Sequence, residues 1–179
     1  GVTPKAVASR YDGDPYIEKA ALTKEELTAG VATLKTRVAD NPKDSYLLQE
    51  LGSIQVQLAL AEGGDKTLPL LREAVATFEA AKQPAHGYGY ESILSELAAV
   101  RALCAAYGPE KEARATFDQG FTDFLLSDNA KLLRSVEWYS PAPGWILTLF
   151  QGAAHPRLSE GAKGRLLAEG ARLCFADAD

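Results

Sequence analysis

The stretch GVATLKTRVADNPKDSYLLQELG, which spans residues 30–52, decides the fold of this chain. It places a small residue, Gly30, one turn before Leu34, and it continues through Pro42 to Gly52. In stacked helical hairpins a small residue lets two helices approach, and a large residue one turn later fills the gap between them. The stretch therefore predicts the end of one helical hairpin and the start of the next.

Capping signals set the boundaries of the first two helices. Thr23 followed by Glu26 forms a capping box, which predicts a helix start at Thr23. This helix is expected to end before Asn41-Pro42, because the residue before a proline disfavours the α region. Asp44 is a favourable N-cap for a second helix, which is expected to end at Gly63-Gly64.

Helical periodicity continues along the rest of the chain. Thr67 is expected to cap a third helix with Pro69 in its first turn, where the missing N–H costs nothing. Further helices are expected at 93–107, 113–124, 128–138, 145–153 and 159–175, with loops at 85–90 and 139–144. The sequence shows no alternation of apolar and polar residues typical of strands, so we predict an all-α fold.

A pair of a small and a large residue recurs along the chain, as Gly30 with Leu34, Ala74 with Phe78, and Ala113 with Phe117. A 34-residue register counted from Ser45 also matches at Leu48, Leu51 and Gly52. These residues resemble the tetratricopeptide repeat. The resemblance covers roughly residues 11–127. It departs from the family at Gln55, where tyrosine is preferred, and at Arg101, where glycine is preferred.

The resemblance implies a short right-handed solenoid of stacked antiparallel helix hairpins, closed by C-terminal capping helices. We expect an extended lead-in at 1–14 and a single helical domain at 15–179. Within that domain the expected units are repeats at about 15–44, 45–84 and 89–127, and capping helices at 128–179.

The resemblance also implies a function, which is non-catalytic binding of a peptide-like segment of a partner protein. First-helix side chains line the groove in this family, which places on it Tyr46, Gln49, Ser53, Val56 and Gln57. Gln49 and Ser53 do not match the variant that grips a partner's C-terminal carboxylate. The competing interpretation of all five residues is an ordinary solvated helix face.

A cluster of aromatic residues suggests an alternative, a pocket for a small ligand or an enzyme substrate, helped by His86 or His155. The cluster comprises Tyr88, Tyr90, Trp138, Tyr139 and Trp145, next to glycines and prolines that stiffen the backbone. These rings could instead plug the end of the array where the repeat pattern stops. A third hypothesis is a purely structural subunit of an assembly.

Composition limits the remaining classes of function. A net charge of −5 without a basic run argues against nucleic-acid binding. The densest apolar stretch, residues 145–150, is far shorter than the roughly 20 residues that a membrane span needs, so we expect a soluble chain. Because the chain begins at Gly1 without a methionine, we expect a processed or truncated N-terminus, which leaves cytoplasmic, periplasmic and secreted locations all open.

Residues that carry metal or redox chemistry are few. Cys104 and Cys174 are expected to be buried thiols rather than a disulfide, although a disulfide is the open alternative. His86 and His155 lie far apart in loops and do not form a metal-binding pattern. No catalytic motif or phosphate-binding loop is present, so we expect no cofactor and no enzymatic activity.

Overall fold

A computed structural model of the chain describes residues 22–127 and 141–176. Over these residues the chain forms seven α-helices and one 3₁₀ turn, and no strand. The all-α prediction is therefore confirmed for the described part of the chain. The elements are α2 (Lys24–Asp40), α3 (Ser45–Glu62), η1 (Gly64–Lys66), α4 (Thr67–Lys82), α5 (Tyr88–Tyr107), α6 (Glu110–Leu126), α8 (Pro141–Ala153) and α9 (Glu160–Ala176).

The expected caps begin the first two helices. The backbone N–H of Thr23 donates to the Glu26 carboxylate at 2.8 Å, and the N–H of Glu26 donates to Thr23 Oγ1 at 3.2 Å, which completes the capping box of α2. The Asp44 carboxylate accepts from the N–H groups of Tyr46 and Leu47 at the start of α3. Such caps satisfy donors that a helix start leaves unpaired, and each typically stabilises a helix by about 1 kcal/mol.

Three local expectations are wrong. Thr67 does not cap α4, because the 3₁₀ turn η1 runs directly into the helix, and the Thr67 N–H donates to the carbonyl of Gly64. The loop expected at 85–90 is shorter, since Gly87 adopts φ 55° and α5 begins at Tyr88. The loop expected at 139–144 is helical from Pro141 onward. The helix expected at 128–138 lies outside the described residues.

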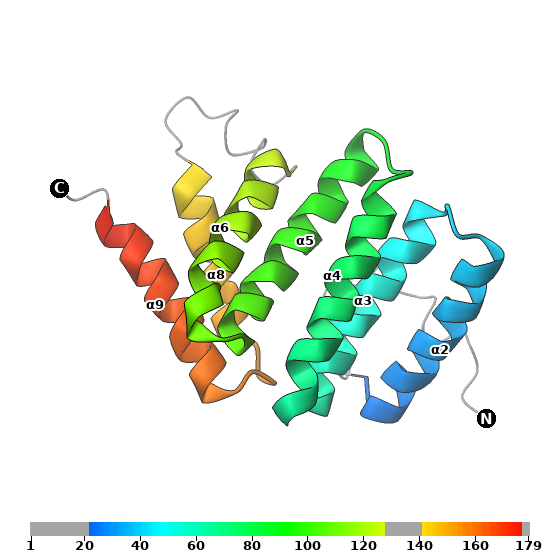
Figure 1. Cartoon of the computed structure of the whole chain (residues 1–179), viewed down its shortest axis with the longest axis horizontal. Helices are drawn as coiled ribbons and strands as arrows, with labels where there is room; N and C mark the ends of the chain where they lie inside the picture. Colours follow the sequence, from blue (N-terminus) through cyan, green and yellow to red (C-terminus); the bar gives the residue numbers. More distant parts are fainter. Residues whose placement is uncertain (1–21, 128–140, 177–179) are drawn as a thin grey trace, which may run out of the picture.

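The helices pack against their neighbours in chain order (Figure 1), and α5 lies at the centre because it also contacts α3, α8 and α9. Three apolar clusters fill the spaces between them. One lies between α2 and α3, a second joins α3, α4 and α5, and the third joins α5 and α6 to α8 and α9. The core therefore runs as a series of clusters along the row of helices.

Two glycines of the chain lie at close contacts between helices. A Cβ atom on Gly52 would lie 2.8 Å from the ring of Phe78, which is buried at 1% exposure between α3 and α4. A Cβ on Gly120 would lie 3.1 Å from the ring of Trp145 and 3.2 Å from the carbonyl of Ala98. A side chain at Gly52 would therefore displace the Phe78 ring, and one at Gly120 would be tightly packed; in both positions space, not backbone conformation, favours glycine.

Candidate ligand-binding face

The five residues predicted to bind a partner lie along one side of α3. Tyr46, Gln49 and Ser53 follow at steps of three and four, and Val56 and Gln57 lie three and four positions after Ser53, which places all five on a single helix face. Tyr46, at the N-terminal end of the face, is 62% exposed, while Gln49, Ser53, Val56 and Gln57 are half-buried. The face therefore combines one exposed aromatic ring with a half-buried polar stripe.

Two residues of this stripe hold α3 against α5. Gln49 Nε2 donates to Ser92 Oγ at 3.1 Å and to Glu96 at 3.4 Å. Ser53 Oγ donates to Glu96 Oε2 at 2.8 Å. Gln49 and Ser53 thus have a structural role, because they hold α3 against α5.

The C-terminal half of the same face opens into a pocket of about 170 Å³. Helices α3, α5, α8 and α9 and the α8–α9 connection supply its walls. The lining residues are Val56, Gln57, Leu60, Ala99, Ala102, Leu103, Thr148, Gln151, Gly152, His155, Leu158 and Leu166. Two of the five predicted residues, Val56 and Gln57, therefore line this pocket, which we call the α8 pocket.

His155 is the titratable residue in the lining of the α8 pocket. Its Nδ1 accepts the backbone N–H of Arg157 at 3.2 Å, so the neutral imidazole carries its proton on Nε2. Burial lowers the pKa of His155, and the positive charge of Arg157 lowers it further. His155 is therefore neutral at pH 7 and offers an N–H donor from Nε2.

The α8–α9 connection is tied to the start of α2. The guanidinium of Arg157 donates to the backbone carbonyl of Leu22 at 2.8 Å, a contact between residues far apart in the sequence. This hydrogen bond fixes the connection that carries His155 and Leu158. Leu22, the first described residue of the chain, thus helps to hold the pocket wall that His155 and Leu158 form.

Only Tyr90 and Trp145 of the expected aromatic pocket have described side chains, and these two pack in different clusters. Trp145 is 1% exposed and packs against Phe121 and Phe124, with ring centroids 6.0 and 5.6 Å away. Tyr90 packs instead against the cluster of α3, α4 and α5. Tyr88 is the first residue of α5, and Trp138 and Tyr139 lie outside the described residues. Trp145 thus fills the core between α6 and α8.

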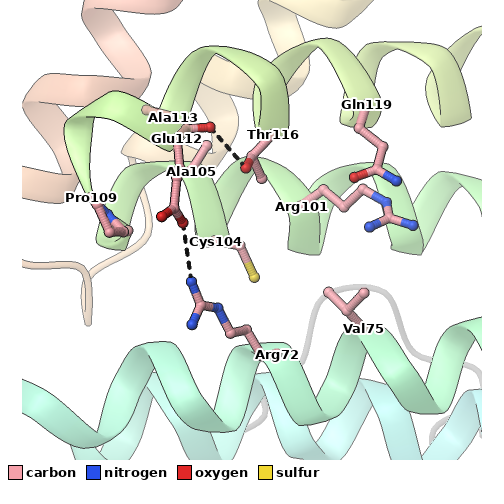
Figure 2. Close-up of a pocket in the computed structure, with 11 residues that line it drawn as sticks. Arg72, Val75, Arg101, Cys104, Ala105, Pro109, Glu112, Ala113, Thr116 and Gln119 are labelled. Carbon is pink, nitrogen blue, oxygen red and sulfur yellow. Dashed lines mark hydrogen bonds and ion pairs between the residues drawn. The ribbon is translucent and has the colours of Figure 1, made fainter.

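A second pocket, of about 220 Å³, lies between α4, α5 and α6 (Figure 2). Arg72 of α4 reaches across it to Glu112 of α6, with 3.5 Å between the charged groups. Arg101 of α5 also lines it and pairs with Glu79 and, at 2.7 Å, with Asp123. The charges around this pocket are therefore paired with one another, so it presents no clear binding chemistry.

The ion pair of Arg101 and Asp123 is largely buried, with side-chain exposures of 11% and 12%. Burial raises the pKa of Asp123, and the neighbouring guanidinium only partly opposes this rise. Ionised Asp123 is thus strained by desolvation and depends on Arg101. The pair holds α5 to α6 beneath the second pocket.

The two cysteines are free thiols in different environments. Cys104 is buried, and burial raises its pKa to about 11, so it is protonated at neutral pH. Cys174 is exposed on α9, so the prediction that it is buried is wrong. His86 is exposed just before α5 and does not line either pocket described here.

Among the described residues, no group of three or more histidine, cysteine or acidic side chains is arranged to hold a metal ion. No helix in the same part of the chain is long and apolar enough to cross a membrane. Comparison with protein-family models, with curated proteins and with solved structures finds no match to this chain. Function is therefore inferred from the geometry of the face.

Proposed function

We propose that this chain is a non-catalytic interaction module, similar to a tetratricopeptide solenoid, that binds a peptide-like segment of a partner along α3 and α5. In this arrangement α3–α4 and α5–α6 are two successive hairpins, and α2 is the second helix of a preceding one. Helices α8 and α9 then cap the array. The direct contact between α3 and α5, the first helices of the two hairpins, supports this assignment.

One observation carries the proposal, namely that a single face joins an exposed anchor, a polar stripe and an apolar pocket. Tyr46 lies at one end and the α8 pocket at the other, with the hydrogen-bonded stripe of Gln49, Ser53 and Glu96 between them. Binding energy in protein interfaces concentrates in a few aromatic or apolar anchors surrounded by polar groups. A segment lying along α3 would meet such anchors at both ends.

A peptide-display selection on the immobilised protein tests this function. We expect enriched peptides whose binding weakens at least tenfold in Tyr46→Ala, since removal of an aromatic anchor commonly costs about 2 kcal/mol or more. Phe175→Ala is the matched control, because Phe175 is also a highly exposed aromatic residue, at 73%, but lies on α9. Absence of enriched peptides, or equal loss in both variants, would refute the proposal.

A further inference from the structure

Resting on the proposed function, we propose that the α8 pocket is its specificity pocket. It takes one uncharged apolar side chain of the bound segment, about the size of leucine or phenylalanine. His155 Nε2–H donates to an acceptor oxygen beside that side chain. The volume of the pocket, the chemistry of its lining and the hydrogen bonding of His155 support this assignment.

The volume suits a single side chain. The pocket measures about 170 Å³. An engineered protein cavity of roughly 150 Å³ lined by Leu, Ile and Phe stays dry and binds benzene. One phenyl ring or one isobutyl group therefore fits the α8 pocket, whereas two such groups do not.

The lining excludes charged side chains. The residues that form the walls are apolar or uncharged polar, apart from His155, which is neutral at pH 7. Placing an ionised lysine or glutamate among them would cost several kcal/mol, because no opposite charge in the lining compensates its lost hydration. The pocket therefore discriminates by charge as well as by size.

The donor at Nε2 sets one polar requirement of the ligand, beside the side-chain amides of Gln57 and Gln151, which also line the pocket. Nδ1 is already engaged by the N–H of Arg157, and Thr148 Oγ1 is engaged as a donor to the carbonyl of Gly144 at 3.0 Å. Among the described residues, nothing accepts a hydrogen bond from Nε2. A backbone carbonyl of a bound segment would satisfy it, while the apolar side chain next to that carbonyl occupies the pocket.

Titration of ¹⁵N-labelled protein with N-acetyl-phenylalanine amide, N-acetyl-leucine amide and N-acetyl-lysine amide tests this inference. We expect the first two probes to shift the amide signals of Ala99, Gly152 and Leu158 to saturation, and the lysine probe to leave them unchanged. Equal response to all three probes, or no response to any, would overturn the proposed specificity.

Two alanine substitutions locate the binding in the α8 pocket. Ala99 is exposed at the pocket wall, so Ala99→Phe is expected to fill the pocket and abolish the shifts without unfolding α5. Ala80→Phe is the control, because Ala80 is also an exposed helical alanine but lies on α4, away from this pocket. Binding that survives Ala99→Phe would place the probe elsewhere and contradict the inference.

Two variants of His155 separate the donor from the structural contact. The shorter side chain in His155→Asn can accept the Arg157 N–H as Nδ1 does, but it has no donor at the Nε2 position. The longer side chain in His155→Gln can restore that donor. We expect about 3- to 10-fold weaker binding of the leucine probe in His155→Asn, the range that one lost hydrogen bond produces, and partial recovery in His155→Gln. Unchanged affinity in His155→Asn would remove the donor role.

The dependence on pH gives a second readout of the role of His155. The other lining residues, from α3, α5, α8 and α9, carry no titratable side chain, and Arg157 is the neighbouring charge that acts on His155. Because its pKa is lowered, the ring stays neutral near pH 7, and affinity should change only at acidic pH, where a proton on Nδ1 displaces the Arg157 N–H and places a charge at the pocket wall. The same profile in His155→Asn would contradict the assignment.

The two proposals can fail separately. Some peptides enriched by display could bind Ala99→Phe with the same affinity as they bind the unchanged protein. This result would refute the specificity pocket and leave the proposed binding face intact. The phenylalanine and leucine probes could instead bind saturably while no peptide is enriched. This result would show that the pocket selects small apolar ligands, and it would refute the peptide-binding function.

Discussion

The substitution Gly52→Ala tests whether the close contact between α3 and α4 holds the array together. The added Cβ would lie 2.8 Å from two atoms of the Phe78 ring, well inside van der Waals contact. The ring has little room to move, because Phe78 is fully buried within the cluster of α3, α4 and α5. The methyl group must therefore push the two helices apart or force Phe78 out of its preferred rotamer.

The expected magnitude combines two opposing effects. Replacing a glycine inside a helix with alanine gains about 0.8–1 kcal/mol in helix propensity. Overpacking a dense core costs typically about 1–3 kcal/mol. Gly52→Ala should therefore lower the free energy of unfolding by about 0–2 kcal/mol. Gly164→Ala on α9, where the Cβ would meet nothing within 4 Å, should raise it by about 1 kcal/mol.

Urea denaturation and thermal melting, both followed by circular dichroism at 222 nm, compare the two variants. At about 2–4 °C per kcal/mol for a chain of this size, Gly52→Ala should melt several degrees below Gly164→Ala. The double variant Gly52→Ala/Phe78→Leu should lose less stability than the sum of its parts, because the smaller side chain relieves the clash. If Gly52→Ala stabilises the protein as much as Gly164→Ala does, the described contact is wrong.

Three further predictions follow from individual side chains. In a thiol-reagent assay at pH 8, Cys174 should react rapidly, whereas Cys104, nearly buried at the wall of the second pocket and with a pKa of about 11, should react much more slowly; equal rates would contradict the described burial. Asp44→Ala should destabilise the protein by about 1 kcal/mol in urea denaturation through loss of the α3 cap, and an unchanged midpoint would argue against that cap. Arg101→Met should cost about 3–5 kcal/mol by leaving Asp123 buried and unpaired, and Arg101→Met/Asp123→Leu should recover much of this loss; additive losses would show that the ion pair is not the cause.

Local signals in the sequence predicted most helix boundaries, because caps act through neighbouring residues. The Thr23–Glu26 box and Asp44 each satisfy backbone donors within their own first turn, so their effect does not depend on tertiary structure. The prediction that Thr67 caps α4 was wrong because of the backbone before it. The preceding glycines allow a 3₁₀ turn that supplies a backbone acceptor, and the threonine then lies inside the helix.

The departures from the repeat pattern were visible in the sequence, but their consequences depend on partners from distant helices. Gln55, where the resemblance expects tyrosine, is buried and donates to Glu73 of α4 at 3.0 Å. Arg101, where it expects glycine, pairs with acidic groups on α4 and α6. At both positions a polar contact between helices replaces the apolar or close contact that the resemblance implies. The periodicity of the sequence does not reveal the partners of such contacts, because they lie on other helices.

In the candidate site, the repeat pattern predicted lining residues on α3 but not those on α8 and the α8–α9 connection. The register placed Val56 and Gln57 on the binding face, and both line the α8 pocket. His155 was singled out only as one of two histidines, and Gln151 not at all, because they belong to a part of the chain without the repeat pattern. A face built from repeated helices alone would be an open stripe. Where α8 and α9 pack on α5, that stripe gains a wall and a hydrogen-bond donor, so any selectivity of this protein should map to α8, α9 and their connection more than to α3.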